Sequence, residues 1–148
     1  MERHFQTPPE GNAASILVRR FHRALTRNRA ATDPASPDPR LRGRTYSVPF
    51  QTVWSAARGL VDGGLRGWRL LRADDETGVL EGEARTRMLR FVDDLEVRIT
   101  LDADGQTRVD VTSSSRKGKA DLGTNARRIA RFLRRLDRSV KADRSAPP

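Results

Sequence analysis

Residues 91–115 read FVDDLEVRITLDADGQTRVDVTSSS, and apolar and polar residues alternate along most of this stretch. Alternation with a period of two predicts strands that each bury one face. The sequence Asp-Ala-Asp-Gly at 102–105 separates the two runs and is typical of a tight turn. The stretch therefore predicts an antiparallel hairpin and places the chain among folds that contain a sheet.

The segments before this hairpin extend the pattern. GWRLLRAD at 67–74 and GVLEGEART at 78–86 also alternate, and Asp-Asp-Glu-Thr-Gly joins them. RTYSVPF at 44–50 predicts a further short strand. Between this short strand and residue 67, QTVWSAARGLVDGG at 51–64 predicts a helix that ends at a glycine pair. Its apolar residues at helical spacing are Val53, Ala57, Leu60 and Val61.

A second helix is predicted near the C-terminus. Thr124 or Asn125 is a good N-cap, and one apolar stripe follows: Ala126, Ile129, Ala130, Leu133, Leu136 and Val140. Six arginines are expected on the reverse side: Arg127, Arg128, Arg131, Arg134, Arg135 and Arg138. The order β-α-β-β-β-β-α predicts an α+β fold, in which a single antiparallel sheet of four to five strands carries two helices on one face.

Charge divides the 148 residues into three parts. Residues 1–44 carry nine arginines against four acids, residues 45–123 twelve bases against thirteen acids, and residues 124–148 eight bases against two acids. The net charge of +10 therefore resides at the two ends. We expect a basic arm at 1–43, a domain at 44–140 and a flexible tail at 141–148.

The composition excludes several kinds of chemistry. Cysteine is absent, which rules out disulfides, thiolate catalysis and cysteine metal sites. The only histidines, His4 and His22, lie in the arm, so the domain has no Ser-His triad and no histidine-ligated metal. No apolar run is long enough for a membrane span or a signal peptide. The sequence predicts a cytoplasmic protein without enzymatic activity, cofactor or metal.

The arm contains one amphipathic segment, at about residues 14–28. Its apolar side is formed by Leu17, Val18, Phe21 and Leu25, and its basic side by Arg19, Arg20, Arg23 and Arg27. The proline-containing segment 30–43 predicts an irregular linker to the domain. Two interpretations stay open: the helix packs on its own domain, or it docks on an anionic membrane surface or a partner protein.

A longer motif connects the last strand to the last helix. Residues 115–129 match the pattern S-R-x-G-x-x-D-x-G-x-N-x-x-R-I, and PFQTVW at 49–54 and FVDDLEVRI at 91–99 accompany it. In these three segments the chain resembles the domain-of-unknown-function 1499 family, over about residues 44–138 and without the arm. Lys117 stands where the family has a bulky residue. The resemblance implies a fold and no established activity. Its members in photosynthetic lineages leave open a place beside a photosynthetic or other energy-transducing complex.

The motif has two interpretations, of which its residues favour the structural one. In it, Gly118 and Gly123 permit the turns, Asp121 accepts helix N–H groups and pairs with Arg116, and Asn125 caps the helix. In the other, helix N–H groups with Ser113–Ser115, Arg116 and Lys117 bind phosphate or carboxylate.

Asp93 and Asp94 form the other candidate. Neighbours on a strand point to opposite faces, so the two carboxylates cannot share a proton. Asp93 is expected to face inward, where it needs a basic partner from the motif.

These observations favour a non-catalytic accessory subunit. It would dock on a larger, membrane-associated protein complex through the arm and through Arg127, Arg131, Arg134 and Arg138. An anionic membrane surface is a further partner to consider, and no small-molecule substrate is predicted. The alternatives are an apolar-ligand or lipid-binding domain in which a sheet grips a helix, and non-specific binding of nucleic acid, which is less favoured.

Overall fold

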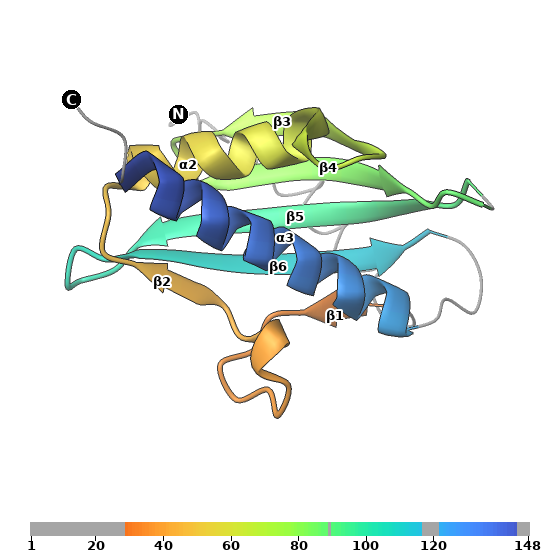
Figure 1. Ribbon diagram of the computed structural model, residues 1–148, viewed down its shortest axis with the longest axis horizontal. Helices are drawn as coiled ribbons and strands as arrows, with labels where there is room; N and C mark the ends of the chain where they lie inside the picture. The colour runs from red at the N-terminus through yellow and green to blue at the C-terminus, as the bar shows by residue number, and fades with distance from the viewer. Residues whose placement is uncertain (1–28, 89, 117–121, 145–148) are drawn as a thin grey trace, which may run out of the picture.

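A computed structural model describes residues 29–88, 90–116 and 122–144 of the chain. The strands are β1 (Arg29–Ala31), β2 (Arg44–Tyr46), β3 (Trp68–Asp74), β4 (Val79–Arg85), β5 (Val92–Leu101) and β6 (Thr107–Ser115). The helices are α2 (Phe50–Gly59), continued by the π-helical turn η2 (Leu60–Gly64), and α3 (Leu122–Arg144), with a 3-10 turn η1 at Pro39–Leu41. Both α2 and α3 lie on one face of the sheet, which confirms the predicted α+β fold (Figure 1).

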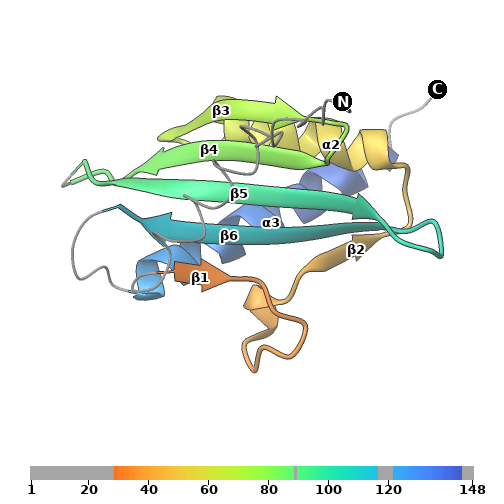
Figure 2. The same ribbon diagram turned by 180° about the vertical axis from the view of Figure 1, so that it is seen from behind.

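The sheet is antiparallel and contains six strands in the described residues, one more than the upper limit predicted. Its order is β1-β6-β5-β4-β3, and β2 also pairs with β6. β1 and β2 lie one after the other along the same edge of β6, opposite residues 112–114 and 107–109 (Figure 2). The predicted hairpin at 91–115 is confirmed as β5 and β6, which pair from Asp93–Ser115 to Leu101–Thr107.

The additional strand comes from the segment predicted to be an irregular linker. Arg-Ala-Ala has little intrinsic preference for a strand, but the open edge of β6 supplies backbone partners. Thr32 extends the contact: its N–H donates to Val111 O at 2.9 Å, and its hydroxyl donates to Asp110 Oδ1 at 2.9 Å. Residues 29–32 are therefore held on the sheet, and the rest of the segment includes the 3-10 turn at Pro39–Leu41.

The first helix has the extent and buried face that its sequence predicts. Val53, Ala57 and Val61 are almost completely buried against the sheet. At Gly63 the backbone has a φ of +87°, which a side chain would strain, and the helix ends there. Below it, a Cβ on Gly82 would lie 2.7 Å from Val61, so glycine allows the close approach of helix and strand.

The long helix α3 crosses the same face diagonally (Figure 1). Its buried residues are Asn125, Ile129, Phe132, Leu133, Leu136 and Val140. The predicted stripe is thus largely correct, but Ala126 and Ala130 are only half-buried, and Phe132 takes a central place. The Phe132 ring stacks on Trp68 with 5.6 Å between ring centroids.

Two hydrogen bonds tie the middle of α3 to β2. The Tyr46 hydroxyl donates to Asp137 Oδ1 at 2.7 Å, and Arg44 Nε donates to Asp137 Oδ2 at 3.2 Å. Burial, together with this acceptor, raises the pKa of Tyr46 far above its usual range. The one acid in the middle of the arginine-rich helix is therefore used inside the domain.

Candidate anion-binding site

A buried polar cluster joins the start of α3 to the ends of β5 and β6. Asp93 is 3% exposed and faces the helix, as its position in the strand predicts. Arg128 Nη2 lies 2.7 Å from Asp93 Oδ2. Since an unpaired buried charge is costly, this ion pair fixes the helix over the sheet.

Asn125 completes the cluster. Its Oδ1 accepts from Ser113 Oγ at 2.7 Å and from Arg128 Nη1 at 2.8 Å, and its Nδ2 donates to Ser115 Oγ at 3.0 Å. The prediction that Thr124 or Asn125 caps the helix is wrong, because α3 begins at Leu122 and Asn125 lies inside it. Its amide is instead used against β6, where it satisfies the hydroxyl of the buried Ser113 and that of the half-buried Ser115.

Arg128 also differs from its predicted position. It was placed among the arginines on the outer side of α3, yet its side chain is only 10% exposed. The reason is Asp93, which attracts the guanidinium into the interface between helix and sheet. Asp93 thus finds its partner in a basic residue of the motif.

The outer face of the sheet, away from the helices, carries a balanced set of charges. Arg116 lies there and donates to Asp94 Oδ1 at 2.9 Å and to Glu83 Oε1 at 3.3 Å. Burial by itself would raise the pKa of Glu83, but Arg69 and Arg116 together hold that pKa below its ordinary value. The other ion pairs on this face are Arg69–Glu83, Arg72–Asp74, Arg72–Glu81, Arg98–Glu96 and Arg108–Asp110.

These contacts bear on the two interpretations of the motif. Ser113, Ser115 and Asn125 satisfy one another, and Arg116 is bound to carboxylates on the outer face. Their polar groups are therefore already engaged within the domain, which supports the structural interpretation. Gly123 lies at the beginning of α3. Lys117, Gly118 and Asp121 lie outside the described residues, so the proposed pairing of Arg116 with Asp121 stays a prediction.

A hollow of about 960 Å³ lies between the first turns of α3 and the adjoining ends of β3 and β4. We call it the arginine hollow, because seven of its twelve lining residues are arginines and the described lining contains no acid. The arginines are Arg66, Arg85, Arg87, Arg90, Arg127, Arg128 and Arg131. Trp68, Ala84 and Gly67 are among the uncharged residues of the lining.

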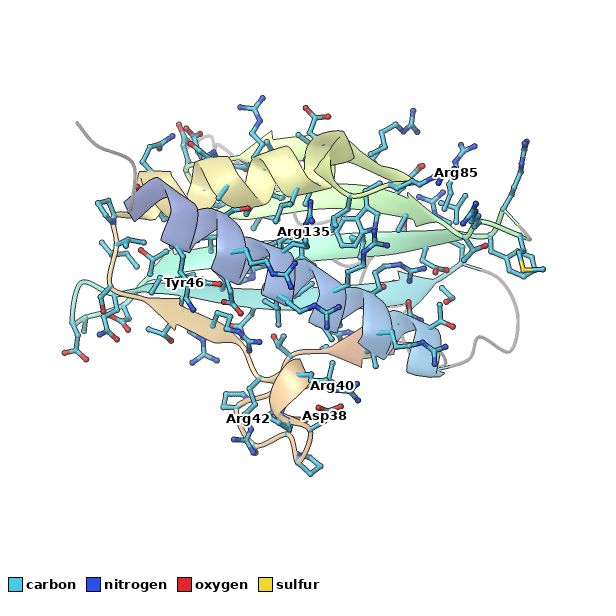
Figure 3. All side chains as sticks on the ribbon, viewed as in Figure 1. Asp38, Arg40, Arg42, Tyr46, Arg85 and Arg135 are labelled. Atoms are coloured by element: carbon cyan, nitrogen blue, oxygen red, sulfur yellow. The ribbon has the colours of Figure 1, made fainter. Side chains whose placement is uncertain are left out.

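Most of these arginines are not neutralised within the described part of the chain. There, Arg66, Arg85, Arg87, Arg90 and Arg131 form no ion pair with a carboxylate. Figure 3 shows Arg85 at the end of the sheet, beside the start of the neighbouring loop. Guanidinium groups offer forked donors that match phosphate and carboxylate oxygens. The arginine hollow can therefore hold an anion that carries several oxygens.

The positive surface continues along α3. Arg127, Arg131, Arg134 and Arg138, predicted as partner contacts, are all exposed. Arg135, labelled on α3 in Figure 3, is also exposed. We call the exposed residues Arg131, Arg134, Arg135 and Arg138 the α3 arginine face. In the arm, Leu17, Val18, Phe21, Leu25 and their four arginines lie outside the described residues.

Four arginines of the hollow were missed by the sequence analysis. Arg66 and the three arginines at 85–90 are far apart in the chain, and the pairing of β3 with β4 brings them together. The backbone N–H of Arg85 donates to Gly67 O at 2.9 Å. A local signal did exist: the connection TRMLRF at 86–91 contains two arginines and three apolar residues and lacks the usual turn residues.

Comparison with protein families agrees with the motif in the sequence. The model of the family described as "Protein of unknown function (DUF1499)" matches residues 7–136. The chain belongs to the DUF1499 family. The DUF1499 match begins at residue 7, which corrects the expectation that the 43-residue arm lies outside the family resemblance. A search of curated proteins found no match.

Two further observations concern the described residues. No helix among them combines the length and the apolar character that crossing a bilayer requires. Nor do they contain a cluster of three or more histidine, aspartate or glutamate side chains able to hold a metal ion. The arginine hollow is therefore the feature of this DUF1499 domain with the clearest chemical preference, and that preference is for anions.

Proposed function

We propose that the protein is a non-catalytic accessory subunit that docks peripherally on a larger, membrane-associated protein complex. Docking uses the α3 arginine face and the basic N-terminal arm, against an acidic surface of the complex. A photosynthetic or other energy-transducing complex is the setting that the family resemblance suggests. The partner is recognised by charge, so association weakens as salt rises.

The observation that carries this proposal is the uneven distribution of charge. On the outer face of the sheet, six acids share ion pairs with five arginines, so the paired charges there nearly cancel. On the opposite side, within the described residues, the α3 arginine face has no ion pair. An accumulation of one sign of charge costs folding energy through self-repulsion, and an acidic partner relieves it.

The alternatives have less support. Large side chains fill the space between helix and sheet, including Phe132, Leu133 and Leu136, which leaves little room for an apolar ligand. Trp54 and Trp68 are buried, so neither is presented for stacking on nucleic acid bases. The experiment must therefore distinguish docking on a protein complex from non-specific binding of nucleic acid by the arginines.

The test is affinity purification of the tagged full chain from gently solubilised membranes. We expect a defined complex to co-purify with the wild type, and Arg134→Glu/Arg138→Glu to lose it in a salt-dependent way. Phe21→Asp and deletion of residues 1–28 should weaken the same association, because the arm adds apolar contacts.

The control is Arg58→Glu, which reverses an exposed charge on α2, and it is compared with Arg134→Glu alone, which reverses one charge on α3. If the control loses the complex as completely as the α3 variant, a specific docking face is excluded. If nuclease treatment releases the partner, the nucleic-acid alternative replaces the proposal. If deletion of the arm has no effect, the docking role belongs to α3 alone.

A further inference from the structure

The loop between β4 and β5 forms one wall of the arginine hollow and exposes apolar side chains. Met88 is 92% exposed and Phe91 is 48% exposed. Neither of them lines the hollow, whereas Arg87 and Arg90 from the same loop do. The loop thus combines two kinds of group: arginines around a hollow and apolar side chains in water.

Two hydrogen bonds between Thr86 and Phe91 close the base of this loop. Thr86 N–H donates to Phe91 O at 2.9 Å, and Phe91 N–H donates to Thr86 Oγ1 at 2.9 Å. Arg90 has a φ of +52°, a backbone conformation in which glycine or asparagine is normally found. Backbone outliers of this kind gather at binding sites. Here the unusual backbone belongs to one of the arginines of the hollow.

Arginines beside exposed apolar side chains favour one kind of anionic partner over another. An acidic protein surface would satisfy the arginines but would not by itself require a fully exposed methionine at the tip of a loop. The interface of an anionic bilayer satisfies both, because apolar side chains enter the acyl boundary while arginines stay among the phosphates. Exposed apolar groups beside basic residues are a recognised mark of such surfaces.

We propose that the arginine hollow binds the phosphate groups of anionic phospholipids and that the side chains of Met88 and Phe91 beside it insert into the bilayer. Arg87 and Arg90 contact lipid phosphates from the loop, and Arg66 and Arg131 contact them from the opposite walls. Forked guanidinium donors suit phosphate oxygens, so a monoanionic lipid such as phosphatidylglycerol is sufficient. This site shares Arg131 with the α3 arginine face, but its loop residues and Arg66 are separate from the protein-docking face.

The test uses the full chain and vesicles of phosphatidylcholine and phosphatidylglycerol in equal parts, at low salt. Co-sedimentation should show binding by the wild type and none to vesicles of phosphatidylcholine alone. Met88→Ser should weaken binding about tenfold or more, through loss of one buried apolar side chain. Arg87→Gln/Arg90→Gln should weaken it about twenty-five-fold, at roughly fivefold for each arginine.

Matched controls separate the site from general attraction. Leu101→Ser removes a side chain that is 61% exposed at the other end of β5, and it should leave binding unchanged. Arg134→Gln/Arg138→Gln removes the same charge from the α3 arginine face and should have a clearly smaller effect than the loop pair. Equal effects of the two arginine pairs would overturn the proposal, since binding would then follow total charge.

Insertion is measured by a label in the loop. Because the chain has no cysteine, Met88→Cys provides a single attachment point for an environment-sensitive fluorophore, and Leu101→Cys provides its control. Anionic vesicles should shift the label at 88 to the blue and leave the label at 101 unchanged. Tripolyphosphate alone should compete for the hollow without that shift, which distinguishes lipid phosphate from free phosphate.

The outcomes also separate this proposal from the docking function. If the loop variants bind vesicles normally while the α3 variants lose the protein complex, only the docking proposal survives. If the label at 88 does not respond to anionic vesicles, the lipid site is wrong whatever co-purifies. Binding of a homopolymeric RNA with the same loop dependence, and no vesicle binding, would assign the hollow to nucleic acid instead.

Discussion

Removal of either partner of the Asp93–Arg128 pair should destabilise the domain, and by different amounts. After Asp93→Ala, Arg128 keeps its hydrogen bonds to Asn125 Oδ1 and Ser113 Oγ and can turn towards the arginine hollow that it lines. After Arg128→Met, the carboxylate of Asp93, a residue that is 3% exposed in the wild type, has no cation to pair with among the described side chains. The loss of Arg128 should therefore cost more.

The magnitude follows from the burial of the two side chains, 10% exposed for Arg128 and 5% for Asp93. Breaking a buried ion pair on one side costs about 3–5 kcal/mol. We expect Asp93→Ala to lower the free energy of unfolding by about 3 kcal/mol and Arg128→Met by about 5 kcal/mol. The total stability of a domain is about 5–15 kcal/mol. In the double variant Asp93→Ala/Arg128→Met both charges are gone, so its cost should fall below that of Arg128→Met alone.

Urea unfolding followed by circular dichroism measures all four proteins. With a slope of about 1.5 kcal/mol per molar urea, a loss of 3 kcal/mol lowers the midpoint by about 2 M. The double-mutant cycle gives the coupling energy, for which we expect about 3 kcal/mol or more. Single variants that lose less than about 1 kcal/mol, or a double variant that loses the sum of both, would refute the buried pair as the lock between α3 and the sheet.

Three other outcomes are expected. The pKa of Glu83 is lowered in the folded protein, so its ion pairs stabilise the fold at pH values above the ordinary glutamate pKa of about 4.3. This stabilisation is lost as the pH falls through the lower pKa of the folded state. When the urea midpoint is measured from neutral to acid pH, it should therefore fall less steeply in Glu83→Gln than in the wild type. Tyr46→Phe should cost about 1 kcal/mol in thermal or urea unfolding through loss of the bond to Asp137, and an unchanged midpoint would show that the bond contributes nothing. A chain that starts at residue 29 should unfold cooperatively, with a urea midpoint close to that of the full chain. A chain that starts at residue 44 should also unfold cooperatively but at a lower urea midpoint, because it lacks β1 and the Thr32 bonds to β6. Equal midpoints for the two chains would contradict the role given to β1.

The elements that local pattern determines could be predicted from the sequence. The strands β3 to β6 alternate apolar and polar residues, and the turn at 102–105 has residues that favour a bend. The helix at 50–64 shows its apolar spacing and its glycine stop. In each case the physical cause lies within a few neighbouring residues, so no knowledge of the rest of the chain is needed.

What could not be predicted depends on distant partners. β1 is a strand because β6 offers an edge, not because Arg-Ala-Ala prefers one. Asn125 is drawn away from a capping role by serines on β6, and Arg128 turns inward because Asp93 is there. The arginine hollow collects side chains from residues 66 to 131, and only the tertiary fold brings them together.

The matched ion pairs on the outer face of the sheet have a consequence for how the molecule approaches a partner. Because the paired charges on that face nearly cancel, the positive charge of the described domain lies towards α3, away from the centre of mass. An anionic surface therefore exerts a torque on the tumbling molecule before any atoms touch. Over a Debye length of about 8 Å at physiological salt, this torque turns the helical side forward. Added salt should consequently slow the rate of encounter more than it speeds release.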